Sequence, residues 1–434
     1  MFDADLWPHQ NKAVKEIFDL WFEGYKSICY QLGTGGGKSR IIRTIVNNHA
    51  AGKNVIYIVA HRKNLVKQLS DEISEVGIKH GIIGNGAPYI KYRVQVCSIN
   101  TLYRKVETLP YPDLIIVDES HHYTSKTFRK IFDVWSDALV CGFTATPRRP
   151  DGTPLKDIFE KLILGPTNKE LIRDGFLCNY AYFAPDILDM DGIHIRRGEY
   201  VQSEYIEKVD NKYIIGDAVE NYKKYADHKP GIICCASIDH AEHVAKQFRE
   251  AGYKSYAVHS KLDDHKISNY IAGLKSGDID LLAQCNLLGE GINVPGATCL
   301  IDLAPTASEI KYLQDRGRVM RRSNGKEKAI IIDHVGNYTR HGMPDDDREW
   351  SLEAVNTSIK KSSKYKRCPD CLQPVKVGAR ICKNFIPPDF IEVCGHQWDA
   401  QIDGTGRMPE QREGELIQIN SVDWQKWNDT MKMS

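Results

Sequence analysis

The sequence lacks an excess of charge of either sign. Its 434 residues include 58 lysines and arginines and 57 acidic residues, which gives a formal net charge of +1. Any surface for a polyanionic partner must therefore be a local patch or groove. No apolar run approaches the length of a membrane-spanning helix, and the first residues, MFDADLWPHQ, lack the basic segment of a secretory signal. These absences predict a cytoplasmic protein without a membrane partner.

Most of the cysteines give no sign of a disulfide framework. They lie in apolar, strand-like runs, as expected for small buried side chains in a reducing compartment. Only four of the 12 cysteines cluster, within 27 residues near the C-terminus. The other eight are Cys29, Cys97, Cys141, Cys178, Cys234, Cys235, Cys285 and Cys299.

The order of the apolar runs predicts the fold class. Short apolar runs alternate with helix-like stretches such as Lys38–Ala51 and Asn64–Val76, a pattern typical of buried parallel strands joined by helices. The alternation occurs twice, so we expect an α/β protein with two doubly wound parallel-sheet lobes in tandem. The strand candidates are Ser27–Leu32, Val55–Val59, Val94–Ser98, Leu114–Val117 and Ala138–Phe143, then Gly231–Cys235, Lys254–Val258, Leu281–Gln284, Cys299–Leu303 and Ala329–Asp333.

The remaining segments divide the chain further. Gly192–Asn211 is polar and is predicted to form a hairpin or insertion, and the lysine-rich Ser358–Arg367 suits a linker. In the second series, helices are expected at Ile238–Ala251, Asp263–Ser276 and Ser308–Met320. The expected divisions are a first lobe (1–185), a connector or insertion (186–215), a second lobe (216–345), a linker (346–367), a metal-binding module (368–400) and a tail (401–434).

A glycine-rich loop follows the first strand candidate and opens a helix, the context that a phosphate-binding loop requires. Glycines let the backbone turn its N–H groups onto an anion. Lys38 would reach the terminal phosphates of a nucleotide, and Ser39 would hold Mg²⁺. The strict pattern has glycine where Leu32 stands, and an ordinary glycine-rich loop is the alternative. The loop consists of Gly33, Thr34, Gly35, Gly36, Gly37, Lys38 and Ser39.

An acidic pair follows the apolar strand candidate Leu114–Val117. Asp118 can hold Mg²⁺, usually through water, and Glu119 can accept a proton from an attacking water molecule. Alone, such a pair could equally be a loop or a helix cap. Together with the phosphate-binding loop, it predicts a site for nucleotide hydrolysis.

The phosphate-binding loop and the acidic pair together resemble motifs of a known family. Gly35–Ser39 and Asp118–His121 are similar to motifs I and II of superfamily 2 helicases of the DExH kind, whose lobes are RecA-like. The resemblance implies that Gln10 reads the adenine of ATP, although a lone glutamine could be a surface residue. Thr144–Thr146 resembles motif III, which couples hydrolysis to the nucleic-acid site; a buried strand end is the alternative.

The second lobe carries two further motifs. The run from Gln314 to Arg321 has the Q-x-x-G-R-x-x-R spacing of helicase motif VI, although a solvated basic face would also place arginines three apart. The resemblance makes Arg318 and Arg321 the fingers that stabilise charge on the transferring phosphoryl group, and makes Gln314 the residue that orients water. Cys285–Pro295 resembles motif V, with Gly291 and Asn293 at the nucleotide. It departs from the common form, since Cys285 and Asn286 replace Thr-Asp and Asn293 replaces Asp.

Polar residues at several strand ends suit contacts with a nucleic-acid backbone. In this family such positions hold phosphates of the tracking strand, without reading sequence. Any one of them could equally cap a helix, so the prediction concerns the set. Binding should be tolerant of sequence and sensitive to salt. The candidates are His61, Arg62 and Thr101 in the first lobe and Ser237, His259 and Lys261 in the second.

The clustered cysteines suit a structural zinc site. Cys368 and Cys371 form a CxxC pair, and Cys382 and Cys394 follow, so four thiolates could surround Zn²⁺ tetrahedrally. His396 is the alternative fourth ligand. Unrelated free cysteines are the other reading, and a disulfide fits a reducing compartment poorly.

The combination resembles RadD-type bacterial DNA-repair helicases with a zinc ribbon, on Leu171–Leu177 after motif III and Ile332–Asn337 after motif VI. The resemblance implies an ATP- and Mg²⁺-dependent DNA helicase or translocase acting on single-stranded, forked or branched DNA. We expect the protein to be a monomer. A bacterial or phage source would fit, with a replication or repair protein bound through the zinc module or tail. The alternatives are an RNA helicase, an ATP-gated remodeller that does not unwind, and, last because no nuclease motif is found, a restriction motor subunit.

Overall fold

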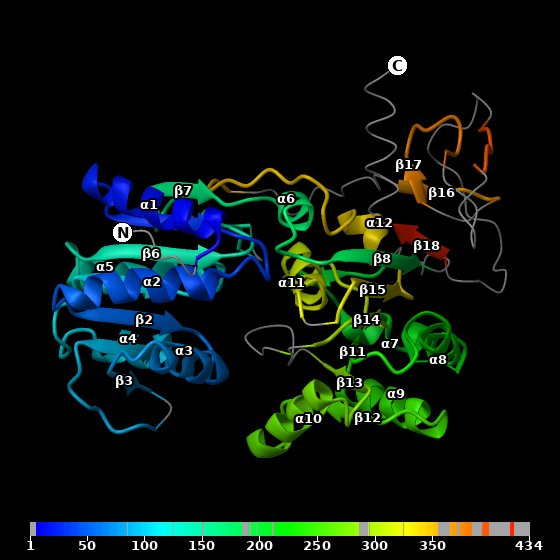
Figure 1. Cartoon of the computed structure of the whole chain (residues 1–434), viewed down its shortest axis with the longest axis horizontal. Helices are drawn as coiled ribbons and strands as arrows, with labels where there is room; N and C mark the ends of the chain where they lie inside the picture. Colours follow the sequence, from blue (N-terminus) through cyan, green and yellow to red (C-terminus); the bar gives the residue numbers. More distant parts are fainter. Residues whose placement is uncertain are drawn as a thin grey trace. The chain divides into compact units, whose positions relative to one another are not determined.

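The computed structural model describes residues 6–354, 365–370, 374–383, 393–398 and 417–420, except positions 85, 124, 150–151, 185–189, 191, 197, 211, 286–293, 295 and 324. The chain divides into two compact units (Figure 1). The first comprises Met1–Leu171 and Asp347–Ser358, and the second Ile172–Asp346 and Ile359–Ser434. Each unit is built on its own parallel sheet, as the alternation of apolar runs predicted.

The first unit has a sheet of strand order β3-β4-β2-β5-β6-β1-β7, with every pairing parallel. Its central strands are buried along their whole length because helices cover both faces, which explains their unbroken apolar sequences. The strands are β1 (Ser27–Gln31), β2 (Ile56–Ala60), β3 (His80–Ile83), β4 (Val94–Ser98), β5 (Leu114–Val117), β6 (Leu139–Thr144) and β7 (Lys161–Leu164).

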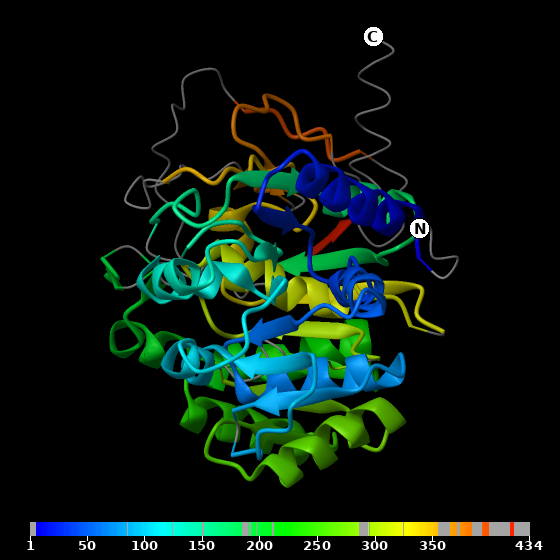
Figure 2. The ribbon, with the colours of Figure 1, turned by 90° about the vertical axis from the view of Figure 1, so that its left-hand side faces the viewer.

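The helices of this unit lie in two layers. The α1, α2 and α3 helices flank one face of the sheet and α4 and α5 the other, as the two views in Figures 1 and 2 show. Such doubly wound sheets place their ligand site at the carboxyl ends of the strands. The helices are α1 (Pro8–Phe22), α2 (Lys38–Ala51), α3 (Lys63–Glu75), α4 (Ile99–Lys105), α5 (Ser125–Val134) and α6 (Asn168–Arg173), with a 3-10 turn η1 (Ser120–His122).

The second unit repeats the architecture with strand order β12-β13-β11-β14-β15-β8-β18. All its pairings are parallel except that of β18 with β8. Side chains of Ser237, Asp263 and Ser308 cap the first turns of α9, α10 and α11, which fixes where these helices begin. The strands are β8 (Asn179–Ala184), β11 (Gly231–Cys234), β12 (Ser255–Val258), β13 (Leu281–Gln284), β14 (Cys299–Asp302), β15 (Lys328–Asp333) and β18 (Ile417–Asn420). The helices are α7 (Ile206–Val209), α8 (Lys212–Ala226), α9 (Ile238–Glu250), α10 (Asp264–Ser276), α11 (Glu309–Val319) and α12 (Asn337–His341).

The segment expected to be a hairpin or insertion contains an antiparallel pair, β9 (Ile195–Arg196) and β10 (Glu199–Tyr200), followed by a 3-10 turn η2 (Gln202–Glu204). It packs over the carboxyl ends of strands in the second unit, where Tyr205 and Val209 join a small apolar cluster with Ala236, Ala304 and Val335. A second antiparallel pair, β16 (Tyr365–Arg367) and β17 (Pro374–Lys376), lies beside the clustered cysteines.

Two expected boundaries differ from those of the compact units. The first lobe was expected to run to residue 185, but β8 pairs with β15 in the second sheet, and the first compact unit ends at Leu171, within α6. The expected linker at 346–367 also begins with a segment that returns to the first unit. There Leu352 accepts hydrogen bonds from the amides of Leu155 and Lys156, and Trp350 lies 4.9 Å from the Arg148 guanidinium. Among the described residues no helix is both long and apolar enough to cross a membrane.

Candidate functional site

The glycine-rich loop connects β1 to α2, as its sequence context predicted. Gly35 and Gly37 adopt φ of 92° and 90°, a left-handed conformation that costs glycine nothing. The helix begins at Lys38, directly after Gly37. The first turn of α2 contains no acidic residue, so its N-terminus keeps the partial positive charge that favours a bound anion.

Gln10 and His9 hold this loop from α1. The Gln10 side chain is fully buried, and its Nε2 donates to the carbonyl oxygens of Gly36 at 3.3 Å and Gly37 at 3.4 Å. Its Oε1 accepts from the Trp7 amide at 3.0 Å, and His9 Nε2 lies 3.0 Å from the same Gly36 oxygen. A Cβ on Gly37 would stand 2.2 Å from Gln10 Nε2, so only glycine fits beside the amide. The Gln10 side chain therefore bonds the loop and the Trp7 amide, and adenine recognition stays a prediction.

The acidic pair faces the loop within the same unit. Lys38 Nζ lies 3.8 Å from Glu119 Oε1, and the two side chains are only 12% and 15% exposed. Burial, reinforced by the charge of Glu119 and opposed by Lys38, raises the pKa of Asp118 to about 7. Glu119 has φ of 46°, an unfavourable conformation for a residue with a side chain and one that clusters at functional sites. A cation and two carboxyl groups thus lie close together, with little exposure to solvent, at the carboxyl end of β5.

A buried hydrogen-bond chain joins His121, which lies two residues after Glu119, to the end of β6. The Thr144 hydroxyl donates to the Thr146 carbonyl at 3.0 Å, so it must accept from His121 Nδ1, 2.8 Å away. The hydrogen on His121 therefore lies on Nδ1, and the same atom is 3.5 Å from Glu119 Oε2. Gln31 of β1 completes the set by donating to the Ala145 carbonyl at 3.0 Å. The three segments expected to form motifs I, II and III are thus in contact.

Sequence reasoning missed a row of three histidine rings, tilted against one another, beside this chain. The His122 ring lies 4.0 Å from that of His121 and 4.2 Å from that of His61, centroid to centroid. His61 follows β2 and was expected to contact nucleic acid, so the row of rings connects that position to His121, beside the acidic pair. The only sequence signal for this contact was His122, the second of two consecutive histidines.

The other first-unit candidates for nucleic-acid contact lie on neighbouring strand ends. Arg62 precedes α3 at the end of β2, and Thr101 lies in α4 just after β4, the strand that pairs with β2. Because the strands are parallel, these positions share one edge of the sheet with the acidic pair. The expected set is therefore brought to a common edge in this unit.

The second-unit candidates have structural partners of their own. Ser237 accepts from the His240 amide at 2.9 Å and caps α9, which is the alternative that the sequence left open. His259 is buried, with Nε2 3.1 Å from Glu242 Oε1, and Lys261 is exposed. A phosphate contact at Ser237 would have to use backbone or share its hydroxyl.

The α11 helix carries the arginines expected to act on ATP. Gln314 and Arg318 are buried, at 3% and 7% exposure. Arg321 follows the helix, and its backbone forms an isolated antiparallel β-bridge with that of Leu177. Arg316 has a different role, since it is 1% exposed and pairs with the buried Asp302 of β14. Burial raises the pKa of Asp302 to about 6, and Arg316 opposes that rise. The ion pair fixes α11 against the sheet, a contact that the motif spacing did not indicate.

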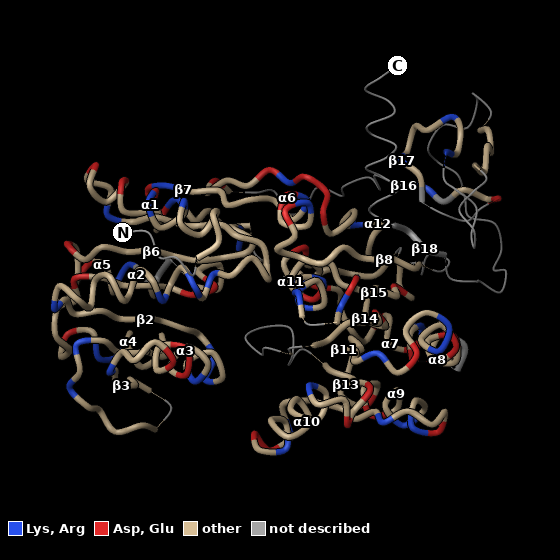
Figure 3. The backbone as a smooth tube through the Cα atoms, in the orientation of Figure 1, with Lys and Arg blue, Asp and Glu red and all other residues tan. Residues whose placement is uncertain are grey.

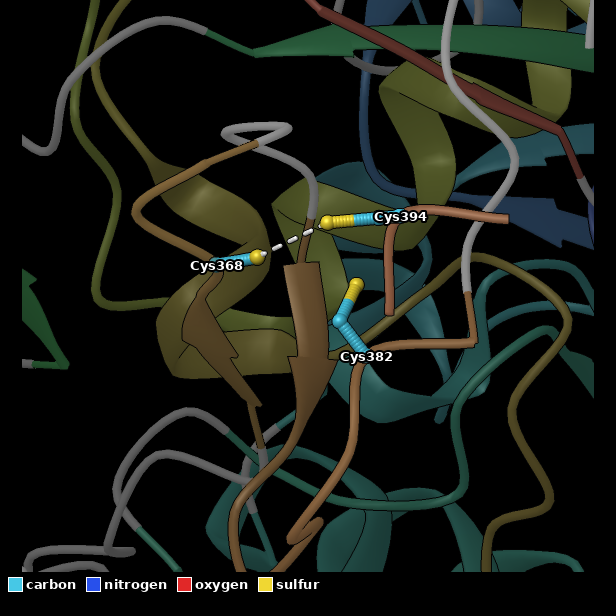
Figure 4. A group of neighbouring side chains, drawn as sticks. All are labelled: Cys368, Cys382 and Cys394. Atoms are coloured by element: carbon cyan, nitrogen blue, oxygen red, sulfur yellow. Dashed lines mark hydrogen bonds between the residues drawn. The ribbon is translucent and has the colours of Figure 1, made fainter. Parts of the chain in front are cut away.

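Three of the clustered cysteines converge (Figure 4). The sulfur atoms of Cys368, Cys382 and Cys394 all lie within 4.8 Å of one another, and those of Cys368 and Cys394 are 3.6 Å apart. Cys368 and Cys382 are fully buried. His396 is not in this group; its Nδ1 lies 2.8 Å from Asp370 Oδ2. Cys371 falls outside the described residues, as do Gly291 and Asn293 of the expected motif V.

Comparison with known proteins gives two family matches. Residues 3–149 match the family described as the res subunit of type III restriction enzymes, and residues 214–323 match the helicase conserved C-terminal domain. A 51.5 kDa protein of Lactococcus phage isolate 7-9 is 30% identical over 392 residues, which are 89% of this chain and 82% of that protein.

Two further relatives have informative names. IRC3 of Saccharomyces cerevisiae, proposed to be an ATP-dependent helicase, is 25% identical over 76% of this chain and 51% of its own length. The DNA 3'-5' translocase XPB2 of Sulfurisphaera tokodaii is 24% identical over 76% of this chain and 81% of that protein. The chain thus spans most of the phage protein but about half of the yeast relative.

Solved structures share the fold. A fragment of a proposed HsdR subunit of a type I restriction enzyme from Vibrio vulnificus YJ016 has a TM-score of 0.62 at 19% identity, over 78% of this chain and 65% of that one. The DUF1998 helicase MrfA bound to DNA has a TM-score of 0.52 at 16% identity, over 77% of this chain and 47% of that one. At these identities the likeness concerns the fold alone.

Proposed function

This chain belongs to superfamily 2 of the helicases, and on that premise we propose that it is an ATP-dependent DNA helicase or translocase acting in replication, recombination or repair. The observation that carries the proposal is the approach of Lys38 Nζ to Glu119 Oε1, 3.8 Å apart and mostly buried. A phosphate-binding lysine and a candidate base that lie side by side suit hydrolysis of a nucleoside triphosphate. The family uses ATP with Mg²⁺.

The site residues of the first unit each have a proposed role in hydrolysis. Lys38 and the loop amides bind the phosphates, and Ser39 and Asp118 hold Mg²⁺, which neutralises charge on the phosphate oxygens. Glu119 orients the attacking water and accepts its proton. His121 holds Glu119 in position through the chain to Thr144, so its role is one of positioning.

Two arginines of the second unit complete the proposed mechanism. Arg318 and Arg321 stabilise the charge that develops on the transferring phosphoryl group, and Gln314 helps to place the water. Gly291 and Asn293 are proposed to contact the nucleotide from motif V. Since the phosphate-binding loop and the arginines belong to different units, ATP binding and hydrolysis would change how the units are held together.

DNA is the proposed nucleic acid. Two of the similar proteins are named for DNA, a DNA translocase and a helicase bound to DNA. Contacts at Arg62 and Thr101 would go to the backbone, so they do not distinguish DNA from RNA by themselves. We propose single-stranded, forked or branched DNA as the substrate, a monomeric protein, and a RadD-type repair role in a bacterium or a phage-infected cell.

ATP hydrolysis in the presence of different nucleic acids tests this function. We expect single-stranded or forked DNA to stimulate the ATPase more than RNA of the same sequence, with stimulation that falls steeply as salt rises. Greater stimulation by RNA would support an RNA helicase instead. Stimulation by DNA without displacement of a duplex or triplex strand would support a remodeller, and an ATPase indifferent to every nucleic acid would contradict the motor.

We also propose that the clustered cysteines hold one structural zinc ion. Three buried or half-buried thiols within 4.8 Å of one another match the sulfur-rich donors and closed shape of such sites. Cys371, two residues after the exposed Pro369, would supply the fourth thiolate. His396, paired with Asp370, would then lie outside the ligand set. The module would offer a surface for a replication or repair protein.

Metal content measures this proposal directly. The purified chain should contain one zinc ion by mass spectrometry of the metal, and Cys382→Ser should contain none. Cys285→Ser is the matched control, because Cys285 is a half-exposed cysteine outside the cluster, and it should keep its zinc. Unchanged zinc content in Cys382→Ser, or a metal-free parent chain purified without chelator, would contradict the site.

A further inference from the structure

The loop Gly86–Arg93, between β3 and β4, exposes large side chains to solvent. All eight residues are exposed, and Tyr89, Ile90 and Tyr92 are 46%, 51% and 40% accessible. Three large apolar or aromatic side chains within four residues of a surface loop form a patch that calls for a partner. None of them takes part in the ATP site.

The loop is held in place rather than left loose. Gln95 of β4 is 1% exposed, and its Nε2 donates to the carbonyl oxygens of Ile90 and Tyr92, each at 2.8 Å. Gly81 of β3 leaves space for this amide, because a Cβ there would stand 2.4 Å from Gln95 Oε1. Arg93 donates to the Lys53 carbonyl and fixes the end of the loop. A buried glutamine whose amide hydrogen-bonds a solvent-facing loop indicates a surface that is organised in advance for binding.

The charge of this region has one sign. From Gly77 to Val106, 30 residues contain no aspartate or glutamate but five lysines and arginines. Figure 3 shows the loop below β3 with basic positions and no acidic ones. Lys79 and Arg93 line a shallow hollow together with Tyr92. The five basic residues, all exposed, are Lys79, Lys91, Arg93, Arg104 and Lys105.

The loop continues the row of proposed nucleic-acid contacts. The strand order β2-β4-β3 places Arg62, then Thr101, then the start of this loop along one edge of the sheet. A Cβ on Gly84 would lie 3.1 Å from Thr101 Oγ1, so the loop leaves the sheet beside that threonine. Nucleic acid that passes Thr101 and continues outward would reach the exposed tyrosines next.

We propose that this loop binds the single strand beyond Thr101, with Tyr89 and Tyr92 stacking on unpaired bases and Lys79 and Lys91 contacting phosphates. The proposal rests on the proposed function. Aromatic rings alternating with cations are what single-strand sites use, because every base offers a face for stacking and every nucleotide a charge. A paired duplex keeps its bases stacked inside and offers the rings nothing comparable.

Binding of labelled oligonucleotides of increasing length to the full chain tests the proposal, with fluorescence anisotropy as the readout. For long single strands, Tyr89→Ala/Tyr92→Ala should weaken the affinity at least about fivefold, the lower end of what base stacking contributes. The shortest strands that still bind should be affected little, because they end before the loop. Tyr89→Phe/Tyr92→Phe keeps the rings and should bind like the parent chain.

Two controls separate this proposal from the function on which it rests. Phe22→Ala removes an exposed ring, 94% accessible on α1, from outside the loop and should change nothing. Equal affinity of the alanine variant and its parent for long strands would overturn the loop proposal while leaving DNA-stimulated ATPase intact. An equal loss on short strands or on duplex would also overturn it. Failure of the parent chain to bind any nucleic acid would instead refute the proposed function.

Discussion

Glu119→Gln should retain ATP binding and lose turnover by about 10³-fold, within the usual range for removal of a general base. The amide keeps the size and hydrogen-bonding reach of the side chain but cannot accept a proton from water. The ion pair with Lys38, 3.8 Å away, is also lost, which removes a constraint on the lysine rather than a phosphate ligand. ATP affinity should therefore stay the same or rise slightly, as measured with a fluorescent nucleotide.

Glu107→Gln is the matched control for that variant. Glu107 is exposed and pairs with Lys130 at 3.3 Å, away from the acidic pair, so its steady-state ATPase should equal that of the parent chain. An equal fall of ATP affinity and turnover in Glu119→Gln would indicate a binding role. Full turnover would show that another group accepts the proton.

Arg318→Lys and Arg321→Lys should each reduce the DNA-stimulated turnover, by as much as about 10³–10⁵-fold where the residue is the finger. Lysine retains the positive charge but not the planar fork that contacts two phosphoryl oxygens at once. ATP affinity should change far less than turnover, since the interaction is strongest in the transition state. Steady-state ATPase at saturating ATP and DNA is the measurement.

A variant of Arg316 distinguishes the catalytic role of Arg318 from a structural role of an arginine on the same helix. Its guanidinium pairs with Asp302, and both side chains are buried. Arg316→Ala would leave that carboxylate unpaired, which typically costs about 3–5 kcal/mol of folding free energy. We therefore expect a lowered urea midpoint for Arg316→Ala, whereas Arg318→Lys should unfold like the parent chain. A shared loss of stability would make the activity of Arg318→Lys uninformative.

The local parts of this molecule could be predicted from sequence because they depend on neighbours in the chain. The central strands are buried on both faces and read as continuous apolar runs, so β4, β5 and β13 were predicted with the bounds that the structure has. The edge strands β3 and β7 were missed, since each is half exposed and lacks such a run. The phosphate-binding loop needed only a strand, glycines and a helix in order.

Contacts between distant segments could not be predicted in the same way. The contact between the His61 and His122 rings and the pairing of Arg316 with Asp302 depend on how strands are ordered in each sheet, which no local pattern records. The assignment of β8 to the second sheet has the same cause. Motif spacing indicated that Arg318 and Arg321 act on ATP because that spacing belongs to a family, and the geometry of that action stays a prediction.

The row of histidine rings also suggests how nucleic acid could influence hydrolysis. His61 follows β2, where nucleic acid is proposed to bind. His122 follows the acidic pair at the end of β5, the strand that pairs with β2. A shift of His61 on binding would move the rings against His121, which is hydrogen-bonded to Thr144. Stimulation by DNA would then act on the position of Glu119 rather than on ATP affinity.

The central step of the proposed mechanism is the action of the two arginines on the transferring phosphoryl group. The decisive measurement is the affinity of ADP with aluminium fluoride, which imitates that group in transfer, compared with ADP alone, in the DNA-bound parent chain and in Arg318→Lys/Arg321→Lys. We predict that the double variant binds ADP like its parent but the fluoride complex at least about 100-fold more weakly. Equal affinity of both chains for the fluoride complex, or an equal loss for both ligands, would contradict the proposed mechanism.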